Sequence, residues 1–343
     1  MAAEKKKLEW AQSLRGVGAL LVVFCHLWLA IQEVYGVENS FCSFMTVDFL
    51  DAGKIGVSIF FFLCGYFVVS VKRKSPKDFW WGRFKRLYPT YWFSIICAIA
   101  FLGTVFSSEE IHILKDTFSW KAIAANFTML QMFFRQQDIL GCYWTLPIEL
   151  LICAMFTVFR KRLDNEKTVI GLFIAVVVST ILMAAARGYA HVKLPVALPL
   201  LTITSLLGYY TRMCDDGIFS RKTQWYLYVT FIIALLPITL LAYNFATEHQ
   251  ETWYRYFLTY SVGTILFIGF NFIGFNRMCV AWRPITVVGN YSYSVYLLHA
   301  VGFNFALRLW GGELSAPTMT VVCLIFIALF SIVAYQCVEK KIR

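Results

Sequence analysis

Apolar residues along this chain are gathered in long blocks, which short polar segments rich in lysine and arginine separate. A helix needs about 20 mostly apolar residues to cross a hydrocarbon core about 30 Å thick. A further apolar stretch, residues 120–134, is too short to span and predicts an interfacial or re-entrant helix. Ten blocks come near the required length and predict ten membrane-spanning helices, at residues 13–34, 54–71, 87–106, 140–159, 168–186, 195–211, 224–243, 255–275, 285–308 and 317–337.

The composition agrees with a membrane protein. Of the 343 residues, 59% are hydrophobic and 15% are charged, whereas soluble domains carry about 25% charged residues. The N-terminal segment runs into a long apolar helix without the short core and cleavage site of a signal peptide. We therefore expect an all-α polytopic bundle that forms one transmembrane domain over residues 1–343, with no appended soluble domain and a multi-pass location in the cell membrane.

The net charge of +11 is placed as membrane topology requires. One set of alternate loops holds most of the lysines and arginines, such as the run from Lys72 to Arg86, while the opposite loops hold acidic residues such as Asp48 and Asp51. The positive-inside rule then predicts that both termini are cytoplasmic. Because the basic residues follow the loops, they indicate contact with membrane lipids and not with nucleic acid.

Several common chemistries have no motif here. The chain contains no GxSxG, Walker or HExxH motif, and none of its five histidines has metal-ligand spacing to another. The ten cysteines show no CxxC spacing. Cys42 and Cys142 fall on the same predicted outer side, and whether they pair stays open. We expect no metal site.

Arg15 and His26 are ionisable residues on the first predicted helix. They are eleven residues apart, about three turns, which places both side chains on nearly one face. Arg15 would lie at the cytoplasmic boundary and His26 deep in the membrane, where a polar side chain is costly and by default functional. A snorkelling arginine and a histidine bonded to a backbone carbonyl form the structural alternative. The near-neutral pKa of histidine suits a general base.

Glu149 lies near the middle of the fourth predicted span, where a carboxyl group must be paired or protonated. Trp144, Thr145 and Pro147 just before it interrupt the lipid-like pattern, as the wall of a cavity would. The alternative role for Glu149 is a structural hydrogen-bond anchor.

A basic run precedes the third predicted span and ends in WWGRFKRLYPTYW. Arg83 and Arg86 share a face if this segment is helical, and Lys85 lies between them. The forked donors of arginine match phosphate geometry. The alternative is topogenic charge that binds anionic lipid headgroups.

The predicted span at 285–308 carries a polar stripe. Ser292, Tyr296 and His299 follow at i, i+4 and i+7, which is one face of a helix. Such a stripe should point into the bundle or a cavity. Substrate binding by Tyr296 and His299 and plain helix–helix hydrogen bonding are equally compatible with it.

These segments together resemble the acyltransferase-3 family of membrane O-acyltransferases, which modify cell-surface glycans and related acceptors. SLRGVGALLVVFCH is similar to the opening motif of the family, an Arg followed after ten residues by a His. IGVSIFFFLCGYFVVS resembles a second segment, with Cys64 in place of the usual Ser. RFKRLYPTYW, YWTLPIEL, YSYSVYLLH and VEKKI resemble four more, in the family order, the last without its Pro.

The resemblance implies a ten-helix bundle that uses acetyl-CoA or another acyl-CoA from the cytoplasm. It makes Arg15 and His26 the catalytic motif, Arg83 and Arg86 contacts of CoA, and Glu149 a polar active-site residue. Cys64 leaves the role of the second segment open. Acceptors of the family are hydroxyls of polysaccharides, lipid-linked sugars or related molecules, and this sequence does not select among them or indicate an oligomeric state.

The predicted mechanism has acyl-CoA phosphates on the cytoplasmic arginines and Lys85, with Arg15 binding phosphate or orienting the thioester. His26 acts as the base, Glu149 holds its tautomer, and Trp144, Thr145, Tyr296 and His299 contact substrate. A covalent acyl-histidine relay is a variant. The rival class is a transporter or exporter of glycans, since buried His and Glu also suit proton-coupled transport. A purely structural membrane protein would leave these buried groups without a role.

Overall fold

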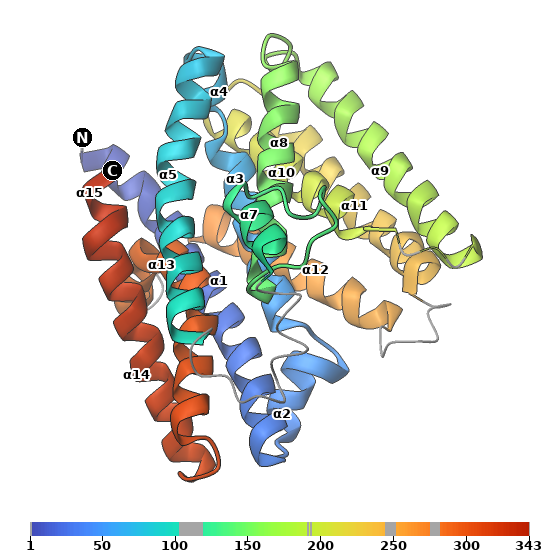
Figure 1. The fold of residues 1–343 in the computed structure, drawn as a ribbon. Coiled ribbons are helices and arrows are strands. Elements are labelled where there is room, and N and C mark those ends of the chain that lie inside the picture. The colour runs from blue at the N-terminus through green and yellow to red at the C-terminus, as the bar shows by residue number, and fades with distance from the viewer. Residues whose placement is uncertain are drawn as a thin grey trace.

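A computed structural model describes residues 2–102, 119–190, 192, 194–243, 252–274 and 282–342, and within these ranges the regular structure is helical (Figure 1). The first half contains α1 (Ala2–Tyr35), α2 (Ser40–Ser43), η1 (Phe44–Asp48), α3 (Ala52–Phe67), α4 (Ser70–Arg73), α5 (Pro76–Cys97), η2 (Ala98–Leu102), α7 (Trp120–Phe127), η3 (Gly141–Trp144) and α8 (Thr145–Phe159). The second half contains α9 (Glu166–Ala190), α10 (Ala197–Asp215), α11 (Arg221–Tyr243), α12 (Trp253–Ile268), η4 (Gly269–Ile273), α13 (Trp282–Trp310), α14 (Ala316–Ala334), η6 (Tyr335–Glu339) and α15 (Lys340–Ile342).

Most of each predicted span is helical, but residues 68–69, 140, 195–196 and 274 lie outside the helices. Positions 103–106 and 275 lie outside the described residues. Within the part of the chain that the structure describes, seven helical segments are long and apolar enough to cross a membrane. The remaining three expected spans coincide with α5, α10 and α13, which are not among those seven. In the view of Figure 1, the start of α1 and the end of α15 lie at the same end of the bundle. The count of ten spans and the cytoplasmic side of the termini stay predictions.

Helix α5 begins at Pro76, well before the expected start at residue 87. The Ser75 side chain accepts a hydrogen bond from the Asp78 backbone N–H, and Pro76 occupies the first turn, where its missing N–H costs nothing. The basic aromatic run is therefore the first half of α5. As a result Arg83 and Arg86 project from the same rigid helix that continues into the bundle.

The short helix expected within 120–134 is α7, which lies against α5. Tyr88 Oη donates to the Thr128 carbonyl at 2.9 Å. Trp92 Nε1 donates to the Phe127 carbonyl at 2.8 Å. These two bonds satisfy carbonyls at the C-terminal end of α7, which are otherwise without helical partners.

Helices α1, α3, α10 and α13 form the centre of the bundle, where α1 packs on both α3 and α13 and α3 packs on α10. At the α1–α13 crossing, a Cβ added to Gly16 would overlap the Ile285 carbonyl, and one added to Gly289 would overlap the Gln12 carbonyl. Small residues allow such close approach of helix backbones in membranes. This contact fixes the two helices that carry His26 and His299.

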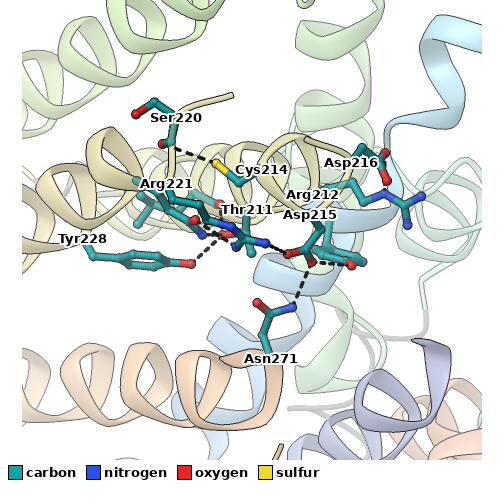
Figure 2. Close-up of polar contacts among 12 residues, drawn as sticks. Thr211, Arg212, Cys214, Asp215, Asp216, Ser220, Arg221, Tyr228 and Asn271 are labelled. Atoms are coloured by element: carbon teal, nitrogen blue, oxygen red, sulfur yellow. Dashed lines mark hydrogen bonds and ion pairs between the residues drawn. The ribbon is translucent and has the colours of Figure 1, made fainter. Parts of the chain in front are cut away.

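A polar cluster ties α3, α10, α11 and η4 together around Asp215 (Figure 2). The Asp215 carboxylate accepts hydrogen bonds from Tyr66 Oη at 2.8 Å and Asn271 Nδ2 at 3.2 Å, and pairs with Arg221. Thr211 on α10 bonds to the Tyr228 hydroxyl of α11 at 2.7 Å. The cluster crosslinks four helical segments at one end of α10.

Candidate functional site

Two pockets penetrate the bundle from opposite halves of α1. The first, called here the Arg15 pocket, encloses about 730 Å³ up to its open mouth, and its polar or ionisable lining comprises Arg15, Cys64, Arg83, Arg86, Thr145, Glu149, Ser292, Tyr293 and Tyr296. The second, the His26 pocket, has a volume of about 1090 Å³ including its open mouth. It is lined by His26, Leu29, Ala30, Glu33, Leu102, Ile139, Leu140, Gly141, Cys142, Ala300, Phe303, Asn304 and Arg308. Arg15 and His26 therefore share a helix but open onto different pockets.

Arg83 and Glu149 form an ion pair within the Arg15 pocket. Arg83 Nη1 lies 3.1 Å from Glu149 Oε1, and Cys64 Sγ lies 3.9 Å from the same oxygen. The pair joins α5 to α8. A buried charge is tolerated when it is paired and hydrogen-bonded, which accounts for a carboxylate in the first half of the apolar helix α8.

The other basic residues predicted to bind CoA lie differently. Arg86 is exposed at the pocket wall and has no ion-pair partner among the residues that the structure describes. The Arg15 guanidinium lies over the Phe67 ring, 4.9 Å from its centroid. Lys85 is exposed beside the Trp81 ring, 5.8 Å from its centroid, and is not part of the pocket lining.

His26 is hydrogen-bonded to His299, with 2.7 Å between His26 Nδ1 and His299 Nε2. His299 is fully buried, and its Nδ1 lies 2.8 Å from the Tyr296 carbonyl oxygen. The expected contact between His26 and Glu149 is thus not formed, because each has another partner. Sequence reasoning found both histidines but not their pairing, which depends on the α1–α13 crossing.

Tyr296 separates the two pockets. Its hydroxyl lies 2.8 Å from the Cys142 carbonyl oxygen, to which it can donate, and 2.7 Å from Thr145 Oγ1. Thr145 Oγ1 lies 3.3 Å from the same carbonyl oxygen. Tyr296 and Thr145 line the Arg15 pocket, whereas Cys142 lines the His26 pocket. The Phe60 ring packs edge-on against Tyr296 with 5.6 Å between centroids. We call this layer the Tyr296 partition.

The remaining predicted residues do not all reach a pocket. Trp144 lies in η3, packs on the core and is not part of either lining. Cys42 and Cys142 are both free thiols. Glu339, near the C-terminus, was not expected to be buried, but it accepts a hydrogen bond from Ser294 at 2.6 Å. Its signal in the sequence is an acidic residue directly after an apolar block.

No cluster of three or more side chains that could bind a metal occurs among the residues described. His112, His191 and His249 lie outside them.

Long apolar helices with ionisable side chains gathered between them define a multi-pass membrane protein with a polar interior. The chain belongs to the acyltransferase-3 family, since the family model, described as an acyltransferase domain, matches residues 8–336.

Similar proteins include three bacterial relatives. YrhL of Bacillus subtilis, assigned as a peptidoglycan O-acetyltransferase, is 23% identical over 87% of this chain and 52% of its own length. The O-acetyltransferase OatA of Staphylococcus aureus is 22% identical over 87% of this chain and 54% of its own length. The peptidoglycan O-acetyltransferase OatA of Listeria monocytogenes is 28% identical over 72% of this chain and 44% of its own length.

This chain therefore spans about half the length of the curated relatives it matches. No solved structure matches it.

Proposed function

We propose that the protein transfers an acetyl group from cytoplasmic acetyl-CoA to a hydroxyl group of a cell-surface glycan. The observation that carries this proposal is the division of the interior into two pockets. Arginines line one pocket, a histidine lines the other, and one layer of side chains lies between them. A donor and an acceptor on opposite sides of a membrane need such an arrangement.

The Arg15 pocket suits the phosphates and thioester arm of acyl-CoA. Arg15, Arg83 and Arg86 line it, and Arg83 and Arg86 belong to the basic run that the positive-inside rule assigns to the cytoplasmic side. Arg86 is the foremost phosphate contact, because it has no competing carboxylate within the described part of the chain. Arg83 is engaged by Glu149, and this pair shapes the wall along which the thioester arm would lie.

The His26 pocket suits a neutral hydroxyl acceptor. Besides His26, it presents the polar side chains of Glu33, Asn304 and Arg308, which are hydrogen-bonding groups for sugar hydroxyls. Peptidoglycan is the acceptor class named for two of the relatives, and we take it as the first candidate here.

His26 is the proposed general base. It removes the proton from the acceptor hydroxyl as the oxygen attacks the thioester carbonyl, so that a C–O bond forms. The C–S bond then breaks and CoA leaves as the thiolate, which the solution on the donor side protonates. The imidazolium returns its proton to the solution that the His26 pocket opens to, and His26 is neutral again. For the thioester carbonyl to approach His26, the Tyr296 side chain must move aside, since its hydroxyl bridges Thr145 and the Cys142 carbonyl.

Reconstitution of the protein in liposomes with labelled acetyl-CoA and soluble peptidoglycan fragments tests this function. We expect labelled acetyl on the glycan, and loss of transfer by at least about 100-fold in His26→Ala, which is the low end for removal of a general base. Binding of CoA should stay within about twofold, because His26 is not in the Arg15 pocket.

Trp28→Phe provides the matched control. Trp28 lies two residues further along α1 and lines a different pocket, so this variant should keep the wild-type rate. Wild-type turnover by His26→Ala would overturn the assignment of the base. Flux of glycan without any acetylated product would favour transport instead.

A further inference from the structure

The partner of His26 is a second imidazole, which differs from the carboxylate usually found beside a catalytic histidine. The two rings are nearly parallel, at 15°, and their nitrogens are 2.7 Å apart. Only one hydrogen can lie between two such nitrogens. The direction of this hydrogen bond therefore decides which nitrogen of His26 carries a proton.

The backbone of α13 sets the protonation of His299. Its Nδ1 lies 2.8 Å from the Tyr296 carbonyl oxygen and 3.2 Å from the Val295 carbonyl oxygen. A carbonyl oxygen only accepts hydrogen bonds, so Nδ1 must carry the hydrogen. The ring is fully buried, and burial of a charge is far more costly than burial of a neutral ring. His299 is therefore neutral, and its Nε2 is an acceptor.

The tautomer of His26 follows from that of His299. Because His299 Nε2 accepts, His26 Nδ1 must donate across the 2.7 Å contact. In neutral His26 the lone pair then belongs to Nε2, on the far side of the ring from His299. His26 lines the acceptor pocket, whereas His299 lines neither pocket.

We propose that His299 is a positioning residue that holds His26 in the tautomer with Nε2 as the free base, and this rests on the function proposed above. The hydrogen-bond chain runs from His26 Nδ1–H to His299 Nε2, and from His299 Nδ1–H to the Tyr296 carbonyl. When His26 takes the acceptor proton on Nε2, its Nδ1–H bond becomes charge-assisted and stronger. The Nδ1 proton stays where it is.

A neutral imidazole has an advantage over a carboxylate at this depth. It accepts one hydrogen bond and orients the ring, but it adds no charge to the membrane interior, where charges are costly. The α1–α13 glycine contact holds the two helices at the distance that this bond requires. The arrangement thus depends on the backbone of one helix and the packing of two.

Nitrogen-15 NMR of the histidine-labelled protein in bilayers reads the tautomer directly. We expect His26 to carry hydrogen on Nδ1 and none on Nε2, with the signal assigned by its loss in His26→Asn. A wild-type signal with hydrogen on Nε2 would overturn the proposal, whatever the activity of the protein.

Kinetics of a matched pair of variants provide the second test. His299→Gln keeps an acceptor oxygen and should retain kcat within about tenfold, whereas His299→Leu removes the acceptor and should lower kcat by about 10²–10⁴, the scale of losing tautomer control in a serine protease triad. KM for acetyl-CoA should change less than about twofold in both, because His299 does not line the Arg15 pocket.

The outcomes separate the two proposals. If His299→Leu turns over normally while His26→Ala is inactive, the positioning role fails and the function stands. If both turn over normally, the proposed base fails. If His299→Leu does not fold, the NMR measurement on the wild-type protein decides.

Discussion

Glu149 and His26, at the candidate site, each bond to an ionisable side chain of another helix. Arg83 is bonded to Glu149, and His26 to His299. Each partner lies on a different helix, so each pair both lowers the cost of burial and fixes a helix contact. Arg86, one turn from Arg83, has an exposed side chain at the pocket wall and remains open to a ligand.

Removal of either Arg83 or Glu149 alone should lower the stability of the protein more than removal of both. Arg83 and Glu149 are 8% and 20% exposed, and loss of one partner of a buried ion pair costs about 3–5 kcal/mol. We expect Arg83→Met and Glu149→Leu each to lower the unfolding temperature in detergent, and the double variant to recover part of the loss. An additive double variant would show that the two side chains do not stabilise each other.

Arg86 should contribute directly to donor affinity. A hydrogen bond to a charged group contributes about 1.5–3 kcal/mol, so Arg86→Ala should raise KM for acetyl-CoA about tenfold or more. Lys85→Ala is the matched control, because Lys85 is exposed next to it but lies outside the pocket lining. Equal effects in the two variants would point to general surface attraction and not to a bound phosphate.

At the scale of elements, α10 is anchored at its end by the Asp215 cluster (Figure 2). The Asp215 carboxylate bonds to side chains of α3, α11 and η4, namely Tyr66, Arg221 and Asn271. The helices that line the Arg15 pocket include α3, so this anchor acts on the pocket through the position of one of its walls.

Asp215→Ala should destabilise the protein by at least about 2 kcal/mol, since it leaves buried donors unsatisfied. Asp164→Ala is the control, because Asp164 also pairs with a cation, Lys72, but is 67% exposed whereas Asp215 is 13% exposed. An exposed pair contributes only about 0–1 kcal/mol. Equal unfolding temperatures for the two variants would contradict a structural role for the cluster.

The long helices could be predicted from the sequence because each one overlaps a long apolar block. Their precise starts could not, as α5 illustrates, because a capping serine and a proline decide its first turn. Helices α5, α10 and α13 are too polar to meet a length-and-hydropathy criterion. Two of them, α5 and α13, carry polar residues that line the Arg15 pocket, among them Arg83 on α5 and Tyr296 on α13.

Pairings could not be predicted in the same way. The spacing of Arg15 and His26 placed them on one face but did not reveal that Tyr296 separates their pockets. Glu149 was assigned to His26 because a triad needs a carboxylate, whereas its actual partner depends on where α5 crosses α8. Such contacts depend on helix packing that no local pattern encodes.

At the scale of the whole molecule, the Tyr296 partition connects the linings of the two pockets through the bonds of Tyr296 to Thr145 and to the Cys142 carbonyl. Tyr296→Ala removes the ring and both hydrogen bonds, which should let water reach a bound thioester from the His26 side. We expect the ratio of acetyl-CoA hydrolysis to glycan transfer to rise several-fold, as expected when a reactive site loses exclusion of water.

Tyr293→Phe is the control for this change. Tyr293 lines the same pocket but bonds to the Leu87 carbonyl, away from the partition. An unchanged ratio in Tyr296→Ala would mean that another layer keeps the pockets apart.

The Tyr296 partition also has an electrical consequence. A water-filled pocket carries the potential of the solution it opens to, so the membrane voltage would fall across the layer that separates the two pockets. In the proposed reaction the CoA thiolate is released on one side of this layer and the acceptor proton is taken up on the other. If that proton leaves outward, each turnover separates one charge across the membrane, against about 2.3 kcal/mol per 100 mV. The rate of glycan acetylation would then depend on the size and sign of the membrane potential.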